Sequence, residues 1–211
     1  MTHLFASTPR DARPVSDQLL ERLSAIPVAN IADGMGRLGM MSSEIRPVHP
    51  SSRLCGRAFT IWTRAGDNKV VHEALDHVRP GDVVVINGEG DTSRALIGEL
   101  IAARAKLRGA VAFVVDGAVR DAPGLAAYGV PTFARAVTGA GPYKSGPGAH
   151  SVPIAMGGVV VNPGDVVAGD DDGVVVIPSE HASAAADAAA AKQASEESVR
   201  TQLEASLDGL R

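Results

Sequence analysis

The sequence predicts a single α/β domain, and three observations lead to this fold class. The 211 residues are 45% hydrophobic but only 3% aromatic, and they include 23 glycines. This composition favours small-residue packing of helices on a sheet over an aromatic-rich β-sandwich. Residues 98–107 have the apolar spacing of a helix, and residues 111–115 form an unbroken apolar run, as in a strand covered on both faces. The segment Pro-Gly-Asp-Val-Val occurs at 80–84 and at 163–167, where each copy predicts a tight turn that starts a strand.

Three segments organise the chain. Residues 1–15 are expected to be a flexible N-terminal arm, residues 16–178 the folded α/β domain, and residues 179–211 a C-terminal Ala-rich helix capped by Ser179. This helix is expected to pack on its own domain or on a neighbouring subunit. Its last turns carry an apolar stripe that would fit such a neighbour, formed by Val199, Leu203 and Leu207.

The first elements of the domain should be short helices. Ser16 is expected to cap one of them, with Val15 and Leu20 spaced as a hydrophobic staple around the cap. Residues 27–33 should form a second helical turn that the following glycine ends. Asp67 is expected to cap a third helix, whose apolar face is formed by Val70, Val71, Ala74, Leu75 and Val78.

Strands and loops should fill the rest of the domain. A strand is expected at 83–86, and Gly109 should end the helix before the 111–115 strand, because glycine readily adopts a positive φ. Residues 138–151 are rich in Gly and Pro and predict a long loop, a candidate lid or subunit contact. Short strands around turns should follow at 154–161 and 165–178.

The helix at 98–107 and the strand after it should bring polar residues together. The chain advances roughly 15 Å along the helix and returns roughly 17–20 Å along the strand. Glu99, at the helix start, should therefore lie near the turn Asp116-Gly117-Ala118 and near Arg120 and Asp121 beyond it. The helix N-terminus adds unpaired N–H groups and a positive dipole end at the same place. The sequence thus predicts a site for a small carboxylate.

These residues resemble a known family. The resemblance rests on Gly98-Glu99-Leu100-Ile101, on the 20 residues between Glu99 and Arg120, and on the motifs at 116–121, 157–165 and 171–178. Together they resemble the 4-hydroxy-4-methyl-2-oxoglutarate aldolase family, which is shared with the regulator of ribonuclease E activity A. The resemblance runs from about residue 20 to 180. It implies an RraA-like, swivelling β/β/α-type domain that assembles as a homotrimer or a hexamer.

The resemblance also implies an activity and a role for each motif residue. Aldolases of this family are metal-dependent lyases that release pyruvate from 4-hydroxy-2-oxo acids and often decarboxylate oxaloacetate. By motif position, Asp121 would hold Mg²⁺ or Mn²⁺ and Arg120 would bind the pyruvoyl group, while Glu99 would help to position the water that protonates the enolate. The substrate-binding residues would be Gly98, Leu100, Ile101 and Arg120, with backbone N–H groups of Leu100 and Ile101 holding the carboxylate.

One departure from the family pattern and one open assignment bear on these roles. Glu99 stands where the best-known aldolases have Asp, and the extra methylene would change rate and substrate more than the reaction class. Family members also borrow a carboxylate from the adjacent subunit, near the C-terminus. Which residue would supply it here stays open among Glu180, Glu196 and Glu197.

The chemistry can also be argued from the residues. Retro-aldol cleavage of a 2-oxo acid builds charge on an enolate, which a Schiff-base lysine or a metal with a cation must stabilise. The chain has four lysines, and none is expected to end an apolar strand that points into a pocket: Lys69, Lys106, Lys144 and Lys192. A hard divalent ion with few carboxylates and several waters is therefore the favoured route.

Each site residue also has a simpler explanation. Asp121 could cap a short helix through 123–128, and from the residues alone this ranks slightly ahead of metal binding. The resemblance reverses that order, and both roles can coexist. Arg120 could be a solvated surface arginine, and Glu99 could simply complement the helix dipole.

Composition excludes several other classes. Twenty basic and 24 acidic side chains give a net charge of −4 with no basic run, so no nucleic-acid partner is expected. The chain shows no signal peptide and no apolar stretch long enough for a bilayer, so a cytoplasmic protein is expected. Cys55 is the single cysteine, which rules out an internal disulfide and favours a buried hydrophobic role.

Three weaker motifs do not support other sites. His72 and His77 lack the spacing of a helical zinc pair, and the glycine loop at 88–93 fails the dinucleotide fingerprint and is expected to form a pocket wall. Asp170–Asp172 lacks the calcium-loop pattern and predicts a turn. The leading hypothesis is a metal-dependent lyase acting on a small 2-oxo acid. The alternative is a non-catalytic binding regulator of the ribonuclease E type, ranked second because such members usually lack the paired acid and Arg-Asp.

Overall fold

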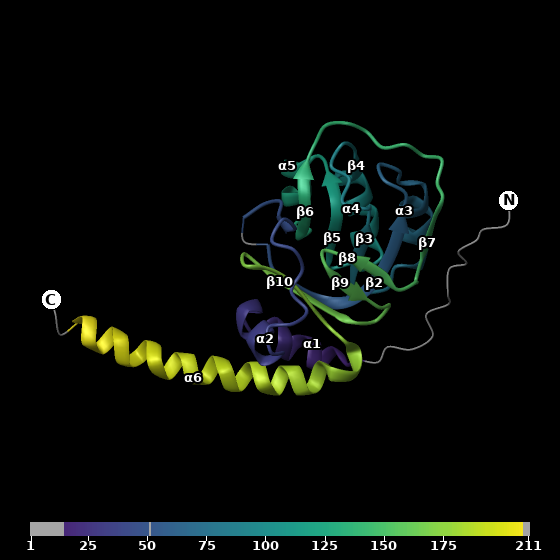
Figure 1. Cartoon of the computed structure of the whole chain (residues 1–211). Coiled ribbons are helices and arrows are strands. Elements are labelled where there is room, and N and C mark those ends of the chain that lie inside the picture. The colour runs from purple at the N-terminus through teal and green to yellow at the C-terminus, as the bar shows by residue number, and fades with distance from the viewer. Residues whose placement is uncertain (1–14, 51, 209–211) are drawn as a thin grey trace.

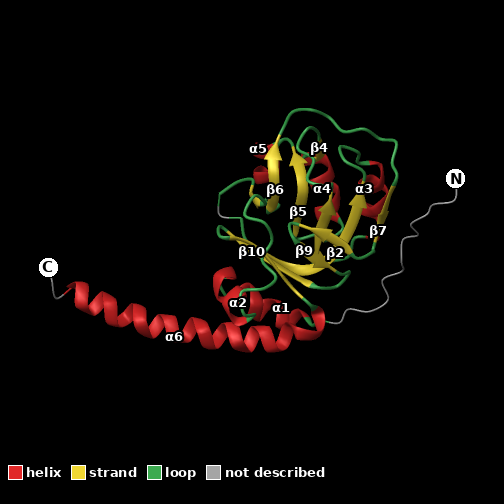
Figure 2. Ribbon diagram, viewed as in Figure 1, coloured by secondary structure: helices red, strands yellow, loops and turns green. Residues whose placement is uncertain are grey.

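The computed structural model describes residues 15–50 and 52–208 (Figures 1 and 2). Its helices are α1 Asp17–Ser24, α2 Val28–Gly34, α3 Lys69–Ala74, α4 Glu99–Leu107, α5 Ala122–Ala127 and α6 Ala182–Asp208, with short 3₁₀ turns at Leu75–His77 and Ser179–His181. Its strands are β1 Arg46–Pro47, β2 Leu54–Thr63, β3 Asp82–Asn87, β4 Ala95–Ile97, β5 Ala112–Val119, β6 Thr132–Val137, β7 Gly148–His150, β8 Ile154–Met156, β9 Val159–Val161, β10 Val166–Asp170 and β11 Gly173–Ile177.

A mixed sheet forms the centre of the described chain. Its main order is β1-β6-β5-β3-β2-β10-β11, with β4 beside β5, β7 beside β2, and β8–β9 as a separate hairpin. Strands β2, β3, β5 and β6 run parallel to one another, as expected where helices connect successive strands. The remaining pairs that involve β1, β7, β10 and β11 are antiparallel.

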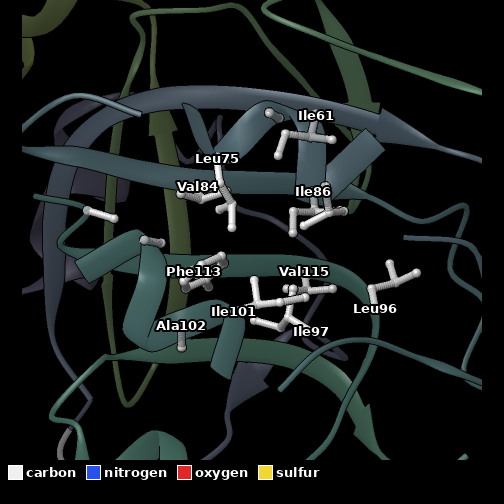
Figure 3. Packing of buried hydrophobic residues seen from close by; sticks show 14 of the residues in the cluster. Ile61, Leu75, Val84, Ile86, Leu96, Ile97, Ile101, Ala102, Phe113 and Val115 are labelled. Atoms are coloured by element: carbon white, nitrogen blue, oxygen red, sulfur yellow. The ribbon is translucent and has the colours of Figure 1, made fainter. Parts of the chain in front are cut away.

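The alternation of side chains along each strand creates two packed layers. Val84 and Ile86 of β3 point to the face covered by α3 and α4, where they meet Phe113 of β5 (Figure 3). Val83 and Val85 point to the other face and pack with residues of the β8–β9 hairpin and of β10 and β11. The central strands thus have α3 and α4 on one side and further strands on the other, which confirms the α/β fold with β/β/α layers. Helices α1, α2 and α6 cover the outer face of β10 and β11.

The helix–strand unit around the predicted site is confirmed, with one correction. Helix α4 ends before Gly109, whose φ is 94°. Asp116-Gly117-Ala118, predicted to be a turn, lies within β5 instead. The strand continues because Ala118 and Val119 pair with β6 and β4, and a register shift after Val115 accommodates the residues between.

The helix starts were predicted correctly in one case and wrongly in two. Ser16 caps α1 and accepts a hydrogen bond from the Leu19 N–H. The N-cap of α3 is Asn68, although the carboxylate of the preceding Asp67 accepts a hydrogen bond from the Lys69 N–H. Ser179 does not cap α6, because it begins a 3₁₀ turn and its N–H is bound by a carboxylate of the domain.

The two ends of the described chain are arranged differently. The expected arm at 1–15 lies outside the described residues except for Val15, which is buried. The first half of α6 packs on α1 and α2, whereas its last turns extend beyond the rest of the fold (Figure 1). Despite its length α6 is too polar to span a membrane, and no other described helix could do so.

Candidate functional site

A cavity of about 350 Å³ opens where β4 and β5 end and α4 begins. We call it the site pocket. It collects residues from four segments that are distant in the sequence. Its lining is formed by Asn68, His72, Ala95, Leu96, Ile97, Gly98, Leu100, Ile101, Arg120, Asp121, Gly141, Pro142 and Lys144. The structure therefore brings five of the six predicted site residues to one cavity.

Asp121 occupies the N-cap position of α5 in a left-handed conformation, with φ 57° and ψ 41°. Its side chain makes no capping hydrogen bond, so the simpler explanation of this residue is not observed. The carboxylate is 40% exposed and lies 3.4 Å from Nε of Arg120. Among non-glycine residues this backbone conformation is uncommon, and it leaves the carboxylate available at the pocket.

Gly98 allows the start of α4 to approach Arg120 and Asp121 closely. A Cβ at this buried position would lie 2.9 Å from Cγ of Arg120 and would overlap the Asp121 carboxylate. The Arg120 N–H donates to the carbonyl of Ile97 at 3.0 Å, which ties the end of β5 to the helix entrance. The N–H groups in the first turn of α4 have no partner within the helix, and two of them belong to Leu100 and Ile101, which line the pocket.

Glu99 is the predicted site residue that does not line the pocket. Its side chain lies over Gly124 of α5, where an added Cβ would be 2.8 Å from Cβ of Glu99. Glu99 is therefore close to the helix that follows Asp121, as its position at the start of α4 predicts. Its carboxylate does not face the cavity shared by Arg120 and Asp121.

Sequence reasoning missed three polar residues of the pocket. Lys144 lines it from a loop: it ends no apolar strand, as expected, but no sequence pattern indicated that it would reach the pocket. Asn68 and His72 line it too, and Oδ1 of Asn68 is a buried oxygen without a hydrogen-bond partner in the described structure. Burial, with Lys144 and Arg104 nearby, lowers the pKa of His72, so the ring favours its neutral form. No sequence spacing links these residues to Arg120.

The segment that carries Lys144 is held by Asp67, which is fully buried. Its carboxylate accepts hydrogen bonds from the N–H groups of Ser145 at 2.7 Å and Gly146 at 2.9 Å, besides that of Lys69. Burial opposes ionisation of Asp67, but these three hydrogen bonds and the nearby Arg64 outweigh burial and lower its pKa. The predicted capping residue is thus the anchor of the pocket loop.

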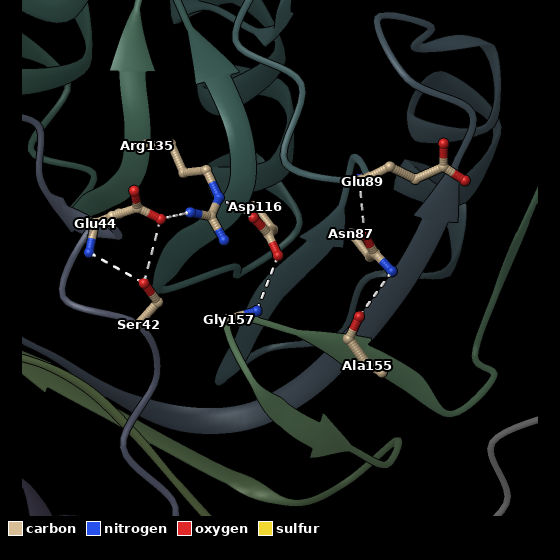
Figure 4. Close-up of polar contacts among 8 residues, drawn as sticks. All are labelled: Ser42, Glu44, Asn87, Glu89, Asp116, Arg135, Ala155 and Gly157. Carbon is tan, nitrogen blue, oxygen red and sulfur yellow. Dashed lines mark hydrogen bonds and ion pairs between the residues drawn. The ribbon is translucent and has the colours of Figure 1, made fainter.

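A second polar cluster, separate from the site pocket, surrounds Asp116 (Figure 4). The buried Asp116 carboxylate accepts hydrogen bonds from Arg135 and from the Gly157 N–H at 2.9 Å, and Glu44 also pairs with Arg135. The hydrogen bond that Arg135 donates to the Asp116 carboxylate is the main cause of the raised pKa of Arg135. These residues adjoin a separate cavity of about 650 Å³, whose wall includes part of the predicted 88–93 glycine loop.

The described residues suit one kind of metal site. No group of three or more His, Cys, Asp or Glu side chains among them could enclose an ion. A single half-exposed carboxylate fits Mg²⁺ or Mn²⁺ that keeps several waters, and it does not fit a closed tetrahedral zinc site. Burial raises the pKa of Cys55 to about 12, so its thiol stays protonated, as expected of a packed side chain.

Comparisons with known proteins agree on one family. The sequence model of the RraA-like family, described as Aldolase/RraA, matches residues 28–176. A protein of Halalkalibacterium halodurans named "Putative 4-hydroxy-4-methyl-2-oxoglutarate aldolase" is 36% identical over 179 residues, which cover 85% of each chain.

Two solved structures extend this likeness to the fold. Streptomyces coelicolor RraAS2, described as an unusual member of the RNase ES inhibitor RraA family, is 30% identical with a TM-score of 0.80, over 89% of this chain and 98% of that one. The RNA-processing inhibitor RraA from Thermus thermophilus is 30% identical with a TM-score of 0.66, over 72% and 92% of the two chains.

Proposed function

The chain belongs to the RraA-like family, and from this premise we propose that it is a divalent-metal-dependent aldolase. Its substrates would be 4-hydroxy-2-oxo acids like 4-hydroxy-4-methyl-2-oxoglutarate, cleaved to release pyruvate, with oxaloacetate decarboxylation as a second activity. One observation carries the proposal. Arg120 and Asp121, whose side chain makes no capping hydrogen bond, line the same pocket as the N-terminus of α4. A purely structural Asp at this position would be engaged in a capping hydrogen bond.

In this proposal Asp121 holds Mg²⁺ or Mn²⁺. The ion, when bound, would polarise the carbonyl of a chelating 2-oxo acid and favour enolate formation. The N–H groups of Leu100 and Ile101, at the positive end of the α4 dipole, bind the carboxylate beside that carbonyl. Gly98 lets these groups approach because it has no side chain to fill the space.

The reaction breaks the bond between C3 and C4 of the substrate. The C4 hydroxyl gives its proton to a water molecule in the pocket and becomes a carbonyl, while the bonding electron pair moves to C3 and gives pyruvate enolate. The guanidinium of Arg120 binds the pyruvoyl group and stabilises the negative charge that develops on its oxygen. A proton delivered to C3 then yields pyruvate. Loss of CO₂ from oxaloacetate leaves the same enolate, so one site serves both reactions.

Glu99 is proposed to help position the water that supplies this proton. Its carboxylate lies over Gly124 rather than in the pocket, so this role requires the side chain to rotate. Glu99→Gln should slow pyruvate release and, more specifically, slow the exchange of pyruvate methyl protons with D₂O, which NMR measures. Unchanged exchange in this variant would remove Glu99 from the proposal and leave the other roles in place.

Pyruvate release measured through lactate dehydrogenase tests the function. Wild-type protein is expected to turn over 4-hydroxy-4-methyl-2-oxoglutarate and oxaloacetate with Mg²⁺, and excess EDTA should abolish both activities. No turnover of either substrate by metal-loaded protein would overturn the proposal. Full metal-dependent activity in Asp121→Ala would overturn the assignment of the metal ligand.

A regulatory binding protein is the second candidate function, favoured by the 30% identity to two proteins described as RraA inhibitors. Tight association with a ribonuclease in a pull-down, together with no turnover, would establish it over the aldolase. The retained Arg120 and Asp121 favour catalysis, because a binding role alone gives no reason for a half-exposed Arg-Asp ion pair beside a helix N-terminus.

The proposal includes assembly into a homotrimer or hexamer. The last turns of α6 expose a stripe of three large apolar residues, Val199, Leu203 and Leu207, at 53%, 59% and 61%. An apolar cavity of about 690 Å³ also adjoins the first half of α6, with Leu38 and Val160 exposed at its edge. Apolar surface of this extent on a monomer favours burial against further copies of the chain.

A further inference from the structure

Lys144 is the one pocket residue whose charge the proposed reaction does not use. It is exposed, it lines the site pocket, and it forms no ion pair with any of the described residues. The other lysines have partners or lie elsewhere: Lys69 pairs with Glu73, and Lys192 with Asp33. An ammonium group left unpaired in a cavity is available to a bound anion.

The backbone on both sides of Lys144 is fixed. The carbonyl of Tyr143 accepts a hydrogen bond from the Asn68 N–H at 3.0 Å, and the Tyr143 N–H donates to Gly66 at 2.8 Å. On the other side the Ser145 and Gly146 N–H groups bind the Asp67 carboxylate. These hydrogen bonds therefore hold the backbone of residues 143–146 in place at the pocket. Only the flexible side chain of Lys144 remains free to adjust to a ligand.

A substrate with two carboxylates needs a second cation. The N-terminus of α4 and Arg120 serve the pyruvoyl end in the proposed reaction. Among the lining residues Lys144 is the other permanent cation, because burial and Lys144 itself keep His72 largely neutral. The unpaired Oδ1 of Asn68, which lines the same pocket as Lys144, also offers an acceptor for a ligand donor.

We infer that Lys144 binds the distal carboxylate of the substrate and so selects 2-oxo diacids over 2-oxo monoacids. The inference deepens the proposed function and rests on it, since the proposed substrates are diacids and it names the residue of the same pocket that recognises their distal carboxylate. Lys144 acts here as a binding charge. It is not a Schiff-base nucleophile, because an exposed ammonium lacks the desolvation that makes a lysine amine reactive at neutral pH.

The test compares two ligands that differ only at C5. 2-Oxoglutarate ends in a carboxylate and 2-oxopentanoate ends in a methyl group, and neither has the C4 hydroxyl that cleavage requires. By isothermal titration calorimetry with Mg²⁺, wild-type protein should bind 2-oxoglutarate about tenfold more tightly, the size expected of one charge-assisted hydrogen bond. In Lys144→Met this ratio should fall close to one, and Lys144→Arg should restore most of it.

Lys106→Met is the matched control. Lys106 lies on α4 outside the pocket lining and donates to the carbonyl of Tyr128, so its loss should leave the ligand ratio unchanged. A ratio unaffected by Lys144→Met, or an equal loss for both ligands, would overturn the inference. So would a borohydride-trapped adduct of pyruvate on Lys144.

Turnover separates this inference from the proposed function. Lys144→Met should raise KM for 4-hydroxy-4-methyl-2-oxoglutarate about tenfold and leave kcat/KM for 4-hydroxy-2-oxopentanoate unchanged. If wild-type protein cleaves neither compound but Lys144→Met still removes the ligand preference, the aldolase proposal fails and the binding role stands. If cleavage occurs and Lys144→Met affects both compounds equally, the aldolase proposal stands and the role of Lys144 fails.

Discussion

Asp121 combines a rare backbone conformation with a side chain that could hold a metal, and two substitutions can separate these properties. Asn tolerates the left-handed conformation well, whereas Ala there costs about 1 kcal/mol. Asp121→Asn should therefore keep nearly wild-type stability and lose metal-dependent pyruvate release by about a hundredfold, the order expected when a positioned charged group is lost. Asp121→Ala should lose both. Urea unfolding and the coupled assay measure the two effects, and an active Asp121→Asn would contradict metal binding.

Asp67 should make the stability of the protein depend on acid. Its folded-state pKa is lowered, so its stabilising contribution is present above the ordinary Asp pKa and disappears as pH falls through the folded value, below about pH 4. Asp67→Asn should reduce the free energy of unfolding by about 1–3 kcal/mol at pH 7. The Asp67 carboxylate accepts hydrogen bonds from three N–H groups with its two oxygens, whereas the Asn amide has only one oxygen and no charge.

The difference between wild type and Asp67→Asn should shrink when urea unfolding is repeated at pH 3. Asp171→Asn, at an exposed turn position, is the control and should change stability little at either pH. A difference that stays constant with pH would show that Asp67 acts through packing and not through its charge.

At the level of elements, the junction between α4 and the end of β5 depends on the absence of a side chain at Gly98. The φ of Gly98 is −148°, which any residue adopts, so the effect of Gly98→Ala would be steric. The added Cβ would displace Arg120 and Asp121 and should lower kcat/KM for pyruvate release about tenfold to a hundredfold.

Gly139→Ala is the matched control for this junction, because a Cβ there meets no atom within 4 Å. It should leave activity unchanged, and thermal unfolding should show that both variants are folded. Equal activity of Gly98→Ala and wild type would mean that the close approach of α4 is not needed for catalysis.

Local patterns in the sequence predicted the elements well, and long-range contacts limited the prediction of the site. The spacing at 98–107 and the apolar run after Gly109 yield α4 and β5, because each depends on neighbouring residues. The end of β5 was misplaced because its extension depends on pairing with β4 and β6. Lys144 was missed for the same reason, since hydrogen bonds to residues 66–68 bring its loop to the pocket.

On the scale of the whole molecule, α6 is divided between a packed half and an exposed half. Ala182, Ala186 and Ala189 are buried, and Gly34 lets α2 approach so closely that a Cβ would lie 2.8 Å from the Ala189 nitrogen. Small residues thus make the first half a tight contact. The outer half carries large apolar side chains that the described chain does not cover, which is why assembly is proposed there.

Charged substitutions on the outer half of α6 test this assembly. Val199→Glu with Leu203→Glu should convert the proposed trimer or hexamer into smaller species in size-exclusion chromatography with light scattering, because burying unpaired carboxylates at an interface is costly. Gln202→Glu adds a charge on the same exposed turns without replacing an apolar residue, and it should leave the mass unchanged. The circular dichroism of all variants should match wild type, since exposed positions contribute little to folding. An assembled double variant would contradict the use of this stripe, and a monomeric wild type would contradict assembly itself.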